Sequence, residues 1–196
     1  MEVITTVNLK MMEEITKDLT KKWSINELSK IMNKHYRPVY TSVQTLLSSG
    51  YLIKNENKLI EVSFRDTLLL ELGEKIRLTR IDSKEIIIIK DKLNRIKTTF
   101  FSAILFGSSV YKKGNDIDLL FIIPFSEDIS RFERNIELSL GSSLDLVDLN
   151  IISEESCFEM LNRPNELNVM NEIMKNHLVL SGTENFYNIL KRWKNA

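Results

Sequence analysis

Residues 103–123, AILFGSSVYKKGNDIDLLFII, decide the fold class that we predict for this chain. The stretch is typical of an apolar strand, a turn at Gly107, a short polar connection and a second strand that begins at Asp116. Because successive strand side chains point to opposite faces, Asp116 and Asp118 share one face of the second strand. Two neighbouring carboxylates repel each other, and Mg²⁺, a hard cation that takes oxygen ligands together with substrate phosphates, relieves that repulsion.

The turn follows the first strand directly and contains Gly107, Ser108 and Ser109. A glycine lets the backbone turn tightly and approach a ligand, and the amides that open a following helix suit phosphate oxygens. We therefore expect these three residues to bind the phosphates of a nucleotide beside the two carboxylates.

An apolar strand, Gly-Ser and Asp-x-Asp within a dozen residues resemble the nucleotidyltransferase superfamily typified by DNA polymerase beta, and within it the prokaryotic minimal nucleotidyltransferases. The resemblance implies a third carboxylate on a neighbouring strand, for which residues 143–151, SLDLVDLNI, offer Asp145 and Asp148. These two aspartates are three residues apart and face opposite sides of a strand, so only one can join the pair. In the family the first aspartate of such a string is usually the metal ligand. We therefore predict Asp145, with Asp148 as the alternative.

Two departures from the family's pattern bear on activity. The link between Gly107-Ser108 and Asp116 is a few residues shorter than in many members, and Asn115 stands where serine is usual. A shorter link either tightens the nucleotide site or spoils it, and both outcomes stay open.

The first 63 residues predict three helices and a two-stranded hairpin. Apolar residues recur at helical spacing in the first helix, the capping-box sequence SINE at 24–27 opens the second, and the third starts near Pro38 and stops at Gly50. Two short apolar runs then flank a polar tip at 54–58.

This order of elements resembles the winged helix-turn-helix family, in which the third helix would be the recognition element. The segment is mildly basic, with nine Lys and Arg against six Asp and Glu in residues 1–60. The expected DNA contacts are Arg37, Tyr40, Thr41, Gln44, Lys54 and Lys58. The alternative is a dimerisation or protein-docking module. A homodimer is a further expectation, because helix-turn-helix domains commonly read paired half-sites.

The predicted fold class is therefore α+β, in three parts. Residues 1–63 form the winged helix-turn-helix, residues 64–97 a connector of two helices, and residues 98–196 a nucleotidyltransferase-like domain with a mixed sheet and C-terminal helices. We expect the run of four isoleucines at 86–89 to be buried in an interdomain or dimer surface.

Composition narrows the class of protein. The 27 basic residues balance the 27 acidic ones, so a nucleic acid would have to be met by a local patch. Cys157 is the only cysteine, which excludes an internal disulfide and suits a reducing compartment. No apolar run approaches the roughly 20 residues of a membrane span, so we expect a cytoplasmic protein without a membrane partner.

The resemblance implies a Mg²⁺-dependent nucleotidyltransferase, which moves a nucleotidyl group from an NTP to a protein or nucleic-acid acceptor. ATP is the expected NTP, and two Mg²⁺ ions would be held by Asp116, Asp118 and Asp145. Minimal nucleotidyltransferases often serve as antitoxins, so a HEPN-type toxin is one expected acceptor. The alternative is a transcriptional regulator whose nucleotidyltransferase-like half only senses a nucleotide and is catalytically inactive.

Overall fold

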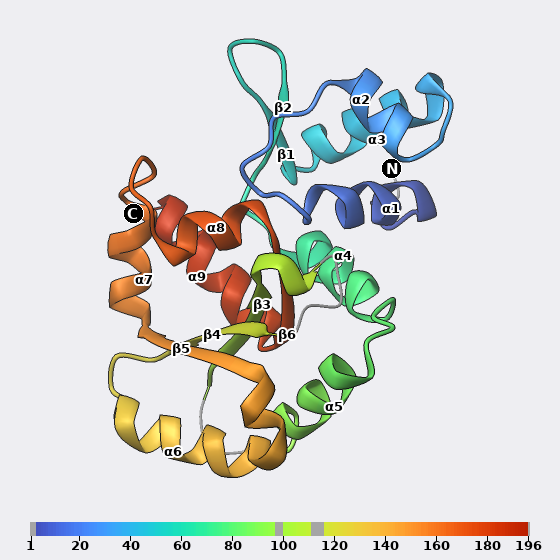
Figure 1. Ribbon diagram of the computed structural model, residues 1–196. Helices are drawn as coiled ribbons and strands as arrows, with labels where there is room; N and C mark the ends of the chain where they lie inside the picture. The colour runs from blue at the N-terminus through green and yellow to red at the C-terminus, as the bar shows by residue number, and fades with distance from the viewer. Residues whose placement is uncertain (1–2, 97–99, 111–115, 196) are drawn as a thin grey trace.

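The computed structural model describes residues 3–96, 100–110 and 116–195, and Asn115 lies outside them. Within this part of the chain the fold is α+β: a small antiparallel sheet near the N-terminus and a four-stranded mixed sheet, both covered by helices (Figure 1). None of the described helices has the length and apolar character needed to cross a membrane.

The N-terminal unit, residues 3–63, contains the predicted three helices and hairpin. Its elements are α1 (Thr6–Ile15), α2 (Ile25–Ile31), α3 (Tyr36–Ser48), β1 (Leu52–Lys54) and β2 (Ile60–Val62). Ser24 caps α2 through the predicted capping box with Glu27, because each side chain accepts a hydrogen bond from the other residue's backbone amide. Trp23 pairs with Ile60 as an isolated bridge, which ties the segment before α2 to the hairpin.

The larger sheet has the strand order β5-β4-β3-β6. Strand β3 is antiparallel to both β4 and β6, whereas β4 is parallel to β5, so the sheet is mixed as predicted. Its strands are β3 (Ser102–Phe106), β4 (Ile117–Ile123), β5 (Val147–Ser153) and β6 (His177–Ser181).

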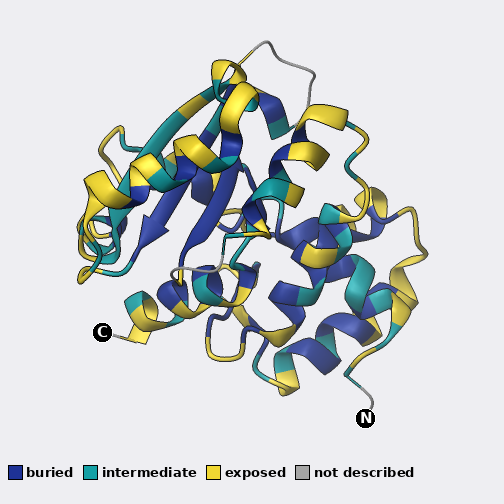
Figure 2. Ribbon diagram, turned by 90° about the horizontal axis from the view of Figure 1, so that it is seen from below, coloured by how far each residue is buried: buried dark blue, intermediate teal, exposed yellow. Residues whose placement is uncertain are grey.

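Helices cover both faces of this sheet (Figure 1). They are α4 (Leu68–Leu78), α5 (Lys84–Leu93), α6 (Ile129–Leu140), α7 (Glu154–Leu161), α8 (Val169–Lys175) and α9 (Thr183–Asn195). Helices α5 and α6 pack on one face against Leu105, Leu119 and Phe121, and helices α7 to α9 pack on the other against Ile104 and Leu120. Figure 2 shows the resulting pattern, with buried strands inside and exposed residues along the outer helices. Apolar residues on both faces explain why β4 reads as a nearly continuous apolar run.

The isoleucine run in α5 is buried only in part. Ile86 and Ile89 belong to the core below the sheet, whereas Ile87 and Ile88 are exposed. Burial of all four between the parts of one chain was wrong for Ile87 and Ile88, because a helix turns by about 100° per residue and one core face takes only every third or fourth position. Their burial in a dimer surface stays a prediction.

Helix α4 connects the N-terminal unit to the sheet without a separate core of its own. Leu69 and Leu70 lie in one continuous apolar cluster with Met12 of α1 and Ile104 of β3. A Cβ at Gly73 would lie 2.9 Å from the backbone carbon of Met12, so the glycine allows α1 and α4 to approach closely.

A buried polar network strengthens this junction. Arg77 of α4 donates to the carbonyl oxygen of Thr16 at 2.9 Å, to Glu74 Oε2 at 2.7 Å and to the carbonyl oxygen of His177. Glu74 Oε1 accepts a hydrogen bond from the Val179 amide at 2.7 Å. Two side chains of α4 therefore join the end of α1 to strand β6.

Candidate functional site

The predicted phosphate turn lies directly against the carboxylate pair. A 3₁₀ helix, η1 (Gly107–Val110), follows β3, and Gly107 has a φ of +68°. A Cβ at Gly107 would lie 2.3 Å from Oδ2 of Asp118, so this backbone approaches the carboxylate as only glycine can. The Ser109 hydroxyl donates to the carbonyl oxygen of Asp116 at 2.6 Å and holds the start of β4 to the turn. Ser108 is exposed and Ser109 is buried, so Ser109 has a structural contact where we expected a phosphate ligand.

The structure brings Asp148, and not Asp145, beside the pair. Asp145 lies exposed in a second 3₁₀ helix, η2 (Gly141–Leu146), and strand β5 begins only at Val147. Asp148 is the register partner of Asp118 in the parallel β4–β5 ladder, so the two carboxylates lie on the same face of the sheet. Our choice of Asp145 assumed that the strand began at about Ser143. Residues 143–146 instead belong to the 3₁₀ helix η2.

The negative charges of Asp116 and Asp148 disfavour ionisation of Asp118. Burial of Asp118 raises the pKa of its carboxyl above the usual range, and the charges of Asp148 and Asp116 raise it further. Glu172 of α8 adds a smaller effect in the same direction. The sequence pattern did not indicate Glu172, because it lies on a helix far along the chain and only the packing of α8 brings it to this sheet.

Asn176, the residue that follows α8, holds the Gly107 turn in place. Asn176 lies between α8 and β6 in an extended conformation, and its Nδ2 donates to the carbonyl oxygen of Gly107 at 2.9 Å. Its Oδ1 is buried and has no partner among the described residues. Asn176 therefore holds the Gly107 turn from the β6 side, whereas the carboxylates lie on the β4 and β5 side. No motif in the sequence indicated this residue.

The donor set fits a hard cation such as Mg²⁺, because it consists of carboxylate oxygens beside a glycine turn. The described residues nevertheless contain no group of three or more His, Cys, Asp or Glu side chains already arranged to hold a metal ion. Asp116, Asp118 and Asp148 are the residues that would hold one.

The predicted DNA contacts gather on the N-terminal unit. Arg37, Tyr40 and Thr41 are exposed on α3, and the half-buried Gln44 follows one turn later. Their spacing of three, four and seven residues places them on one face of the helix. Two further predicted contacts are exposed at the hairpin, at the end of β1 and at the hairpin tip: Lys54 and Lys58.

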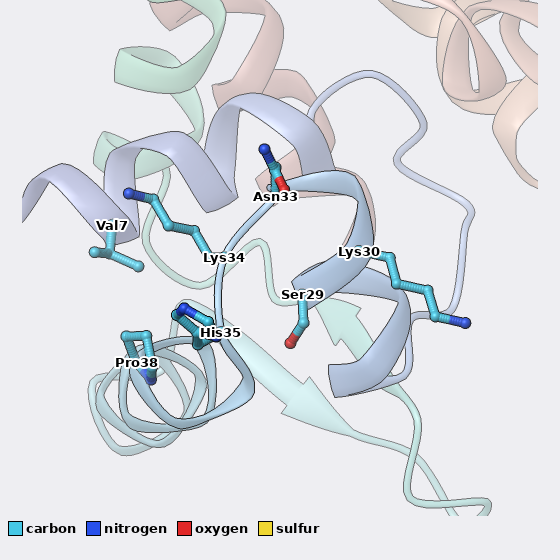
Figure 3. Close-up of a pocket in the computed structure, with 7 residues that line it drawn as sticks. All are labelled: Val7, Ser29, Lys30, Asn33, Lys34, His35 and Pro38. Atoms are coloured by element: carbon cyan, nitrogen blue, oxygen red, sulfur yellow. The ribbon is translucent and has the colours of Figure 1, made fainter.

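A pocket of about 620 Å³ lies at the turn between α2 and α3 (Figure 3). Its lining residues are Val7, Ser29, Lys30, Asn33, Lys34, His35 and Pro38. The pocket carries positive charge, but Figure 3 shows the side chains of Lys30 and Lys34 pointing in different directions. The buried Ser29 hydroxyl donates to the carbonyl oxygen of Ile25 at 2.8 Å and is therefore already engaged. The polar groups do not converge on a ligand position, so the carboxylate turn is the stronger candidate site.

No family model, curated protein or solved structure matches this chain. What the protein does is therefore inferred from the turn with its neighbouring carboxylates and from the exposed face of α3.

Proposed function

We propose that the protein is a Mg²⁺-dependent nucleotidyltransferase. The observation that carries the proposal is the contact between the Gly107 turn and the Asp118 carboxylate, with Asp148 alongside in the parallel ladder. A turn that binds phosphates and carboxylates that bind Mg²⁺ must lie together to bind a nucleoside triphosphate. The close approach of Gly107 to Asp118 supports these roles. Bound Mg²⁺ would supply charge neutralisation for the triphosphate and the departing pyrophosphate.

The chain's own groups have distinct roles in this proposal. The exposed Ser108 and the backbone amides of the turn bind phosphate oxygens, while Asn176 keeps the turn in place. The oxygen of the acceptor hydroxyl forms a bond to the α-phosphorus as the bond from that phosphorus to the pyrophosphate oxygen breaks. Asp148 is exposed on strand β5 and takes the proton of the acceptor hydroxyl.

The acceptor is a protein or a nucleic acid, and ATP is the first NTP to test. A HEPN-type toxin is the protein acceptor that the resemblance implies. The N-terminal unit is proposed to be a winged helix-turn-helix that binds DNA or docks the acceptor, because the outer face of its third helix carries Arg37 and the polar side chains of Tyr40 and Thr41.

The test is calorimetric titration of ATP, GTP, CTP and UTP into the protein, first with Mg²⁺ and then with EDTA. We expect one NTP to bind only with Mg²⁺ and the variant Asp116→Ala to lose that binding. Asp116 is exposed, so the variant should fold, which circular dichroism checks. The proposal would be refuted if Asp116→Ala bound the NTP as tightly as the wild type, or if the folded wild type bound no NTP.

A second candidate function is a transcriptional regulator whose carboxylate site performs no transfer. The short link between Gly107-Ser108 and Asp116 favours it. A duplex gel shift at low salt that weakens steeply as salt is added, in a protein that binds no NTP, would select this function over the enzyme.

A further inference from the structure

Two tyrosines form an exposed aromatic pair at the start of α3. Tyr36 and Tyr40 are 50% and 44% exposed, and they lie one helical turn apart. Their ring centroids are 6.0 Å apart and their planes differ by 26°, so the rings stack on each other. No hydrogen bond ties either phenol hydroxyl to another described residue. The two stacked rings form one exposed apolar patch, and such a patch among polar residues is typical of a contact surface.

The stretch of chain that contains the pair is mostly basic among its charged residues. Between residues 30 and 58 only Glu56 is acidic, whereas five side chains are basic: Lys30, Lys34, Arg37, Lys54 and Lys58. All five basic residues are exposed. A polyanion is therefore the partner that complements the charge of this part of the N-terminal unit.

The spacing of the rings decides how the pair can contact a base. A nucleobase inserted between two rings needs about 6.8 Å, twice the 3.4 Å spacing of stacked bases along one DNA strand. The centroids are only 6.0 Å apart, so no base fits between them and the pair acts as one apolar block. The apolar group that base pairs present in the major groove is the C5-methyl of thymine.

We propose that Tyr36 and Tyr40 determine sequence specificity by contacting thymine methyl groups in the major groove of duplex DNA. The proposal rests on the proposed DNA-binding role of the N-terminal unit. It agrees with the position of the pair, because the N-terminal turns of a recognition helix are the ones that reach base edges. Gln44, one turn beyond Tyr40 along α3, suits the adenine of the same A·T-rich site.

The test compares alternating poly[d(A-T)] with poly[d(A-U)], two duplexes that differ only in the thymine methyl groups. Binding is measured by fluorescence anisotropy at low salt. We expect the wild-type protein to bind the thymine polymer about fourfold more tightly for each methyl buried. The double variant Tyr36→Ala/Tyr40→Ala should bind both polymers equally.

Arg37→Ala is the matched control from the same helix. Loss of this charge should weaken binding to both polymers and leave their ratio unchanged, because phosphates carry no sequence information. Equal wild-type binding to the two duplexes would overturn the inference and leave DNA binding intact. Tighter binding to single-stranded poly(dT) than to either duplex would also overturn it. No binding to any of these polymers by the folded protein would overturn the DNA-binding role itself.

Discussion

Gly107 and Asp118 lie so close that a side-chain carbon on residue 107 would sit 2.3 Å from Asp118 Oδ2. Gly107 begins the 3₁₀ helix η1 directly after β3, and Asp118 lies on β4, where it pairs in register with Phe106. Their contact joins the Gly107 turn to the carboxylate pair. Because the carboxylate is the end of a rotatable side chain, a bulkier residue at 107 would turn it away without preventing folding.

Gly107→Ala should therefore lose Mg²⁺-dependent NTP binding while retaining the fold. Its positive φ adds a cost of about 1–2 kcal/mol in the free energy of unfolding. Gly50→Ala is the control, since Gly50 has a φ of +77° and open space around its Cβ position. We expect a similar loss of stability in urea denaturation but unchanged NTP binding. Equal NTP binding by the two variants would contradict the role of the close contact.

Asp148→Asn and Asp145→Asn separate the two candidates for the third carboxylate. Only Asp148 is paired in register with Asp118, so its variant should weaken Mg²⁺-dependent NTP binding by at least roughly ten- to hundredfold. Asp145→Asn, in the exposed 3₁₀ helix η2, should bind like the wild type. Both substitutions preserve side-chain size, and calorimetry measures both. The reverse order of effects would restore the assignment made from the sequence.

His177 should make the protein sensitive to mild acid. Its side chain is fully buried, and burial together with the charge of Arg77 lowers its pKa to about 3. The folded protein therefore keeps this histidine neutral, while the unfolded chain takes up a proton below its ordinary pKa of about 6.5. Stability is complete above that value and is lost as the pH falls from about 6.5 toward 3. Between pH 7 and pH 5 the loss from this group is roughly 2 kcal/mol.

The measurement is the free energy of unfolding of the wild type and His177→Gln at several pH values. The variant should show a flatter profile between pH 7 and pH 5, even if it is less stable throughout. Glu74, 4.0 Å from His177 Nε2, has a pKa raised by burial and acts in the opposite direction, but it is present in both proteins. The exposed His35 supplies the control, and His35→Gln should keep the wild-type slope. Parallel profiles for wild type and His177→Gln would refute the prediction.

Gly73→Ala should loosen the contact between the N-terminal unit and the sheet. The new methyl group would meet backbone atoms of Met12 and Glu13 at 2.9–3.0 Å, and backbone cannot rotate away. We expect a loss of about 1–3 kcal/mol in the free energy of unfolding, despite alanine's better helix propensity. Lys75→Ala, at an exposed position of the same helix, should stay within about 0.5 kcal/mol of the wild type. Stabilisation by Gly73→Ala would show that α1 and α4 can separate at no cost.

Local patterns predicted much of this fold. The strand, turn and strand of residues 103–123, the capping box at Ser24 and the three helices with a hairpin are all short-range signals, and the structure contains them. Each depends on the chemistry of neighbouring residues, so the sequence carries the information directly.

The full set of residues that form the candidate site was harder to predict from the sequence. The choice between Asp145 and Asp148 depended on where β5 begins. The 3₁₀ helix η2 before β5 has no hydrophobic periodicity from which the sequence could predict it. Glu172 and Asn176 reach the turn only because α8 packs beside it. Tyr36 was overlooked because its exposure, and its stacking on Tyr40, depend on the packing of α3.

By itself, therefore, the sequence determined the α+β class, the Gly107 turn and the Asp116–Asp118 pair, since these follow from residue types a few positions apart. Only the tertiary structure decided which third carboxylate joins them and that α4 merges the N-terminal unit and the sheet into one core. The physical reason is that strand register and helix packing are set by burying apolar surface between segments far apart in the chain, and no local pattern records which distant partner a residue will meet.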